Sequence, residues 1–149
     1  MADLTTTIQE SVVINGSLRG STNSVTTSGI NDVFERIVTC TASVVTTIAV
    51  FDTLPSTSPG AIDVDRTKYV RITNLDPSLV VELAVVTTAT NYQVTLRAGA
   101  SHVLFSGDVV ALGEADTSPS FGTMENLTSL QIKPTTAVTA RVEVFVGIE

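Results

Sequence analysis

Apolar and polar residues alternate along much of this chain with a period of two, which is typical of half-buried β-strands. The clearest case is the C-terminal segment. There Thr139, Arg141, Glu143 and Phe145 alternate with Val138, Ala140, Val142, Val144 and Val146. One face of this segment is apolar enough for a core. The outward positions of the predicted strands are mostly Thr, Ser and Ala, with an occasional Tyr69 or Phe145, and such a surface costs little to desolvate against a protein partner.

The same alternation predicts further strands, separated by loops rich in Pro, Gly, Asn and Asp. One of them places Val44, Thr46, Ile48 and Val50 on a single face. The others are expected at Tyr69–Thr73, Val81–Val85, Tyr92–Leu96, His102–Phe105 and Leu130–Ile132. In the first two of these, Val70 and Ile72 are expected to point inward, and Val81, Leu83 and Val85 to alternate with Glu82 and Ala84. About eight strands with turns every 8–12 residues predict an all-β fold, an antiparallel β-sandwich of jelly-roll-like type.

The first thirty residues differ from the rest because they are rich in Thr, Ser, Gly and Asn. Within them Val12–Ile14 leads into Asn15 and Gly16, the dipeptide best suited to the two positive-φ positions of a type I′ hairpin turn. We therefore expect residues 1–30 to form an extended N-terminal arm or hairpin, and residues 31–149 to form the β-sandwich domain.

Composition supports strands and narrows the partners. Thr and Val make up roughly a third of the residues, and both are β-branched. The formal net charge is −7, and the eight Lys and Arg are scattered singly, so binding to nucleic acid is not expected. The mean hydropathy of +0.35 is high, but no apolar run approaches the ~20 residues that span a bilayer. No membrane association is therefore expected, and the hydrophobicity belongs in a core or an interface.

The sequence start and the cysteine content indicate where the chain assembles. Residues Met1–Thr7 have neither a basic region nor an apolar stretch, so no signal peptide is expected. The single Cys40 cannot form a disulfide within the chain. Both features suit assembly in a reducing cytoplasm.

Two side chains with reactive chemistry occur once each, and neither has a supporting motif. His102 lies near Phe105 in an apolar strand, so it is interpreted as a half-buried strand histidine. Cys40 lies in a strand-like setting with no Gly-rich turn around it, so it is interpreted as a small hydrophobic residue. A Cys40–His102 nucleophile pair is the formal alternative.

Paired carboxylates occur at Asp63 and Asp65 and again at Glu114 and Asp116. Such pairs can bind Ca²⁺, but six to eight oxygens are needed and neither loop is acidic enough, so solvated loop charges are expected. A glycosidase pair stays open, although the chain has no Trp and only two Tyr on which sugars could stack. No catalytic motif is present, and we expect no enzyme activity, catalytic residue, cofactor, metal or small-molecule substrate.

The arrangement of strands and turns is similar to that of small virion proteins of tailed bacteriophages. The matching segments are Ile14–Gly16, Ser28–Val33, Arg36–Val38, Lys68–Asp76, Leu96–Leu104 and Val144–Gly147. This resemblance implies a head decoration, or cement, protein that binds the outer capsid lattice and stabilises the head. Its implied partners are the major capsid protein and copies of itself, as a homotrimer, on the capsid exterior of the virion.

Two other classes of function stay open. One is a tail fibre, spike or baseplate β-domain of the phage, which copy number per virion distinguishes from a decoration protein. The other is a carbohydrate- or ligand-binding β-sandwich, which would bind a sugar or Ca²⁺ as an isolated domain. The scarcity of aromatic residues argues against both.

Overall fold

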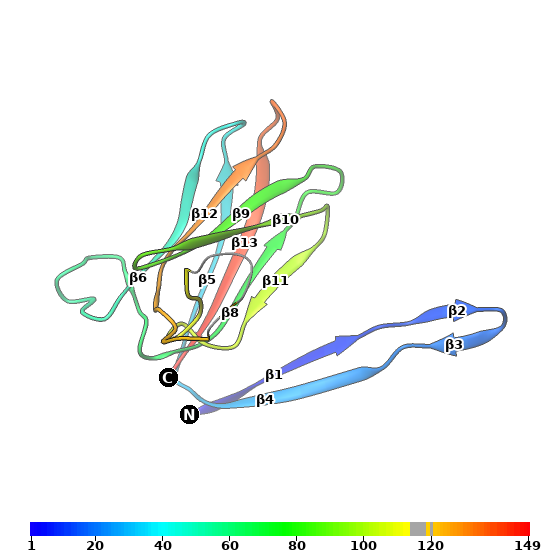
Figure 1. Ribbon diagram of the computed structural model, residues 1–149, viewed down its shortest axis with the longest axis horizontal. Coiled ribbons are helices and arrows are strands. Elements are labelled where there is room, and N and C mark those ends of the chain that lie inside the picture. Colours follow the sequence, from blue (N-terminus) through cyan, green and yellow to red (C-terminus); the bar gives the residue numbers. More distant parts are fainter. Residues whose placement is uncertain (114–118, 120) are drawn as a thin grey trace.

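The fold is all-β. A computed structural model of the chain describes residues 1–113, 119 and 121–149. These residues contain thirteen β-strands and no helix, and so no helix that could span a membrane (Figure 1). The all-β fold with antiparallel sheets that the alternation predicts is confirmed. Four strands form an N-terminal hairpin, and the other nine form two sheets (Figure 1).

Sheet I has the strand order β10-β9-β12-β6-β7. Its strands are β6 (Thr46–Asp52), β7 (Ile62–Asp63), β9 (Val81–Thr87), β10 (Asn91–Leu96) and β12 (Leu127–Pro134). All neighbours are antiparallel except β6 and β7, which form a short parallel pair. The Pro and Gly residues after β6 form a loop, as these turn residues predict, and the short β7 follows this loop.

Sheet II has the strand order β11-β8-β13-β5. Its strands are β5 (Asp32–Cys40), β8 (Thr67–Asn74), β11 (Ser101–Leu104) and β13 (Ala140–Ile148). The C-terminal β13 lies in the middle of this sheet and pairs with β5 on one side and β8 on the other. β5 and β11 are therefore the two edges of sheet II.

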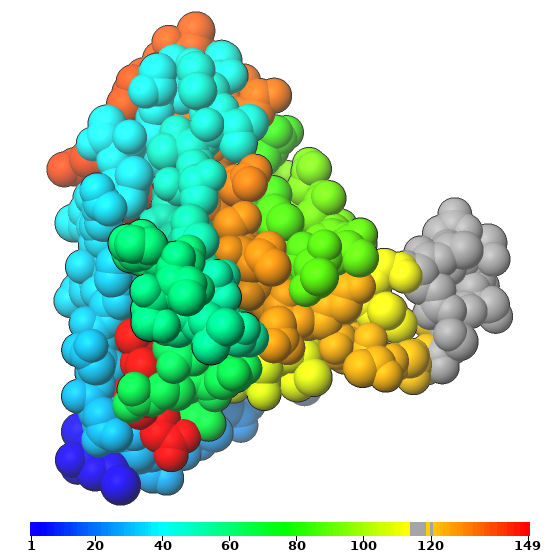
Figure 2. Space-filling model, turned by 90° about the vertical axis from the view of Figure 1, so that its left-hand side faces the viewer, coloured from blue at the N-terminus to red at the C-terminus, as the bar shows by residue number. Residues whose placement is uncertain are grey.

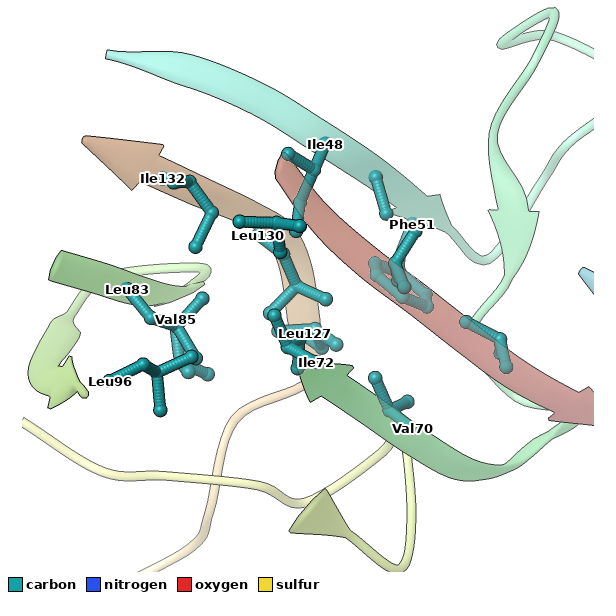
Figure 3. Packing of buried hydrophobic residues seen from close by; sticks show 14 of the residues in the cluster. Ile48, Phe51, Val70, Ile72, Leu83, Val85, Leu96, Leu127, Leu130 and Ile132 are labelled. Atoms are coloured by element: carbon teal, nitrogen blue, oxygen red, sulfur yellow. The ribbon is translucent and has the colours of Figure 1, made fainter. Parts of the chain in front are cut away.

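The core lies between the two sheets and draws on the strands that the alternation identifies. Leu83, Val85, Leu130 and Ile132 of sheet I are fully buried. They pack with Ile72 of sheet II in one hydrophobic cluster (Figure 3). Burying a side chain of this size contributes about 1.5–3 kcal/mol, so the sandwich has a substantial core of its own.

The number of strands exceeds the eight or so that the alternation predicts. Eight strands of four or more residues make up the two sheets of the sandwich, and β7 adds two residues to sheet I. The remaining four are β1 (Ala2–Gln9), β2 (Val12–Ile14), β3 (Ser17–Arg19) and β4 (Thr22–Ile30). We call this hairpin, Ala2–Ile30, the arm. It projects from the sandwich at the end where the two chain termini lie (Figure 1). The N-terminal and C-terminal residues lie close together at this end, as the blue and red atoms in Figure 2 show.

Candidate interaction arm and groove

The tip of the arm is a tight turn whose backbone conformation its residues favour. Asn15 and Gly16 have φ values of 50° and 77°, the left-handed values that a type I′ turn requires. The turn pairs β2 with β3 and brings Val13 opposite Leu18. The same register continues into β1 and β4, where Ile8 pairs with Asn23 and Leu4 with Thr27.

This register gives the β1–β4 ribbon one apolar and one polar face, because paired residues share a face. The apolar face carries Leu4, Thr6, Ile8, Asn23, Val25 and Thr27. The polar face carries Thr5, Thr7, Gln9, Thr22, Ser24 and Thr26. On the polar face the hydroxyls of Thr7 and Ser24 are hydrogen-bonded at 2.8 Å. The ribbon is thus amphipathic in the manner of a strand pair that covers another protein surface.

The tip of the arm exposes large hydrophobic side chains. Leu18 is 72% exposed and Val13 is 67% exposed, and the two are paired on one face. Val12 and Ile14 lie on the other face, the side on which this register places Leu4 and Ile8, and are 50% and 55% exposed. The tip lies far from the sandwich (Figure 1). A protein surface that exposes contiguous apolar residues in this way is characteristic of a binding element.

A glycine shapes the arm between its two halves. Gly20 has a φ of 128°, which favours glycine, and a β-carbon there would collide with the carbonyl oxygen of Glu10. The backbone N–H of Glu10 donates to the carbonyl of Ser21 at 2.9 Å, so the strands stay paired through this point. The two strands therefore approach each other closely at Gly20, between the tip and the rest of the arm.

The root of the arm packs on the outer face of sheet II. Gly147 of β13 leaves room there. A β-carbon on it would lie 3.3 Å from Cδ1 of Ile30 and 3.5 Å from Cδ2 of Leu4. The backbone N–H of Asn31 donates to the carbonyl of Ile148 at 2.8 Å. The arm is therefore fixed at its root, and its tip projects away from the sandwich (Figure 1).

Beside this root, the outer face of sheet II carries an aromatic cluster. Tyr69 contacts Phe105 and Phe145 edge-to-face, with ring centroids 5.6 Å and 6.0 Å apart. The guanidinium of Arg71 lies 5.7 Å from the ring centroid of Phe145 and forms a salt bridge of 2.6 Å with Glu143. Phe105 is 50% exposed, so the cluster reaches solvent. An aromatic and cation–π cluster on an outer sheet face is typical of a contact surface.

A groove of about 270 Å³ separates the arm from this cluster. One side is β1, from Leu4 to Thr7. The other side, which we call the floor, is Tyr69, Arg71 and Phe145. β1 pairs only with β4 in the described part of the chain, so its other edge keeps unpaired backbone groups. The groove therefore combines a free strand edge with an aromatic floor.

A larger cavity of about 640 Å³ lies at one end of sheet I, and its lining includes Asp52 and Glu125. The Glu125 carboxylate already accepts hydrogen bonds from the Thr87 hydroxyl at 2.6 Å and from the Ala89 N–H at 2.9 Å. These bonds lower the pKa of Glu125. An Asp52 oxygen accepts from the N–H of Leu54. Both carboxylates therefore hold loops in place.

The two reactive side chains lie on opposite edges of sheet II. Cys40 ends β5 and is fully buried, and burial raises the pKa of its thiol. His102 is on β11, where Nε2 lies 3.0 Å from the hydroxyl of Tyr92 on β10. Burial lowers the pKa of His102. Because β8 and β13 separate the two edges, the structure does not bring Cys40 and His102 together.

The paired carboxylates show local roles where the structure describes them. An oxygen of Asp63 accepts a hydrogen bond from the N–H of Asp65 at 3.2 Å, which closes a turn. Glu114 and Asp116 lie outside the described residues. Among the residues the structure covers, no group of three or more His, Cys, Asp and Glu side chains could hold a metal ion.

Comparison with known proteins assigns no family to this chain. No family model matches it, and no curated protein matches it. One solved structure with a similar arrangement belongs to a Bacillus endospore appendage, described as part of a family of disulfide-linked pili. The two chains are 10% identical with a TM-score of 0.41, over 82% of this chain and 93% of the other. A similarity of this size carries no inference about the role of this chain.

Proposed function

We propose that this chain is a structural assembly protein, a capsid decoration protein of a tailed bacteriophage that binds the outer capsid lattice through its arm. The observation that carries the proposal is the projecting amphipathic ribbon with exposed Val13 and Leu18 at its tip. A two-stranded ribbon alone is at best marginally stable in water. Such an arm gains its stability when it docks on a neighbouring protein.

The charge distribution supports docking by the arm. Between Thr5 and Thr27 the charged residues are Glu10 and Arg19, so this part of the arm has no net charge, whereas the whole chain carries −7. This neutral part of the arm approaches an acidic or a basic neighbour without strong repulsion. On a symmetric lattice, many modest arm contacts sum to strong retention through avidity. Its partners in this proposal are the major capsid protein and further copies of the chain.

The finer fold assignment, a jelly roll, belongs to the same proposal. Without β7, two four-stranded sheets remain, in the orders β10-β9-β12-β6 and β11-β8-β13-β5. Along the sequence the chain changes sheet after β5, after β7, after β8 and after each strand from β10 to β12. This alternation between two sheets supports a jelly roll, an architecture common among capsid proteins.

Electron cryomicroscopy of the intact virion tests the proposed function. We expect many copies on the outer surface of the head, each with its arm in contact with a neighbour. A handful of copies at the tail would instead identify a fibre, spike or baseplate part. Limited proteolysis provides a second readout. Residues Met1–Thr27 are expected to be cleaved first in the isolated protein and to be protected in the particle, and equal cleavage in both states would contradict docking by the arm.

A further inference from the structure

The tip of the arm and the outer face of sheet II both expose apolar side chains. The tip lies too far from this face to cover it within one chain. The arm carries Val13 and Leu18 at a tip far from the sandwich (Figure 1). The outer face of sheet II carries Phe105, which is 50% exposed, beside the buried ring of Tyr69. Leu4 and Ile30 at the arm root already pack on this face at Gly147, so the face accepts apolar side chains of the arm.

We propose that the groove between β1 and Tyr69, Arg71 and Phe145 receives the arm of a second copy of this chain. A strand of the incoming arm pairs with the free edge of β1 and lays alternate side chains on the aromatic floor, as in β-strand addition. This inference rests on the proposed docking function of the arm and names the partner and its site.

The size of the arm matches what a stable dimer needs. From Thr5 to the turn at Asn15 an extended chain spans about 35 Å, and two strands form a ribbon about 10 Å wide. One face then offers roughly 350 Å². If the whole face of each arm is covered, two exchanged arms with their acceptor surfaces bury at most on the order of 1,400 Å², within the standard range for specific interfaces, and the groove itself takes one part of this area.

Charge also favours the arm as the element that joins two copies. The residues outside Thr5–Thr27 carry the whole net charge of −7, so two sandwich bodies repel each other. Between Thr5 and Thr27 the arm is neutral, and the floor it would meet is neutral as well, because Arg71 is paired with Glu143. Contact through the arm therefore brings two acidic copies together without repulsion between like charges at the interface.

The test uses two variants of the full chain and their mixture. The arm variant is Val13→Asp with Leu18→Asp, and the groove variant is Phe105→Asp. All three residues are at least half exposed, so the fold should persist. The matched control is Val138→Asp, a residue 55% exposed in the turn before β13. Analytical ultracentrifugation measures self-association, and thermal unfolding checks that each variant is folded.

We expect wild type and Val138→Asp to self-associate equally. The arm variant and the groove variant should each have a dissociation constant at least about tenfold higher, since each loses the burial of one or two large apolar side chains. An equimolar mixture of the two variants should form a heterodimer, because one intact arm meets one intact groove. If Phe105→Asp unfolds, Phe145→Ser takes its place as the groove variant.

Three results would overturn this inference: a monomeric wild type, variants that associate as wild type does, or a mixture that gives no heterodimer. A monomeric wild type whose arm is protected only in the virion would place the arm on another virion protein. The proposed function would then stand, while the copy-to-copy groove would be wrong. Absence of the chain from the virion would instead contradict the proposed function and leave the self-association result valid.

Discussion

The Cδ1 atom of Ile30 lies 3.3 Å from the position that a β-carbon would take on Gly147. Ile30 ends the arm and Gly147 belongs to the middle strand of sheet II, so this contact fixes where the arm leaves the sandwich. Cδ2 of Leu4 approaches the same point at 3.5 Å. The absence of a side chain at Gly147 therefore allows the root to pack.

The first prediction concerns this contact. Gly147→Val should displace Ile30 and Leu4 and lower the free energy of unfolding by about 1–3 kcal/mol, because overpacking forces its neighbours to shift. Gly147→Ala should have a smaller effect, since one methyl group needs a movement of only a few tenths of an ångström. Urea denaturation measures both variants. A Gly147→Val protein as stable as wild type would show that the root does not depend on this contact.

The second prediction concerns Asn74, a fully buried polar residue at the end of β8. Its Nδ2 lies within donating distance of three carbonyls, those of Leu79 at 2.8 Å, Leu96 at 3.2 Å and Arg97 at 3.1 Å. Its Oδ1 accepts from the N–H of Asp76 at 3.1 Å. One side chain thus ties together the loops that follow β8 and β10.

Asn74→Ala should lower the free energy of unfolding by about 2 kcal/mol or more, because it leaves buried carbonyls without a donor. Asn23→Ala is the matched control, since Asn23 is exposed on the arm and its loss should change stability little. Denaturant unfolding of both variants measures the difference. Equal stability of the two would show that the loops satisfy their carbonyls without Asn74.

The third prediction separates the shape of the arm from the stability of the sandwich. Gly20→Ala should disrupt the pairing at Glu10, because the new β-carbon would collide with the Glu10 carbonyl oxygen. The φ of 128° at this position also disfavours alanine. Gly16→Asn is the control, because asparagine accepts the left-handed φ of 77° and nothing lies within 4 Å. Gly20→Ala should speed protease cleavage of the arm while the thermal midpoint stays nearly unchanged. A large loss of thermal stability would mean that the arm supports the core.

Much of the sandwich could be predicted because half-buried strands leave a clear period of two. In β8 and β9 the predicted inward residues Val70, Ile72 and Leu83 are fully buried. In β6 the prediction is wrong at Val50, which is exposed, whereas Phe51 is buried. The register of β6 against β12 skips Ile48, so a β-bulge reverses the alternation after it. A bulge depends on the partner strand, and the sequence of β6 alone does not reveal it.

The hairpin of the candidate site could be predicted from the sequence, but the groove could not. The Asn15–Gly16 turn indicates a hairpin, and its two-residue loop fixes a register that the structure carries from Ile14 opposite Ser17 down to Leu4 opposite Thr27. Counting pairs from the turn would have revealed the apolar face of the arm. The groove was not predictable, because only the tertiary packing of the root brings Leu4 and Phe145 to the same groove.

The last prediction concerns His102, the single histidine, which bridges the edges of the two sheets through Tyr92. Burial lowers the pKa of His102 below its ordinary value of about 6.5. The unfolded chain therefore binds a proton at a pH where the folded chain does not. The free energy of unfolding should rise with pH as His102 loses its proton in the unfolded chain, and should level off above about pH 7.

His102→Gln should flatten this rise between about pH 5.5 and pH 7, because no other side chain in the sequence has an ordinary pKa in that window. Tyr92→Phe is the informative companion, since it removes the hydrogen bond but keeps the titrating imidazole buried. It should lower stability at every pH and retain the rise. Denaturant unfolding of the three proteins at several pH values gives the slopes. If His102→Gln keeps the wild-type slope, the pH dependence in this window arises elsewhere, and His102 titrates alike in the folded and unfolded chains.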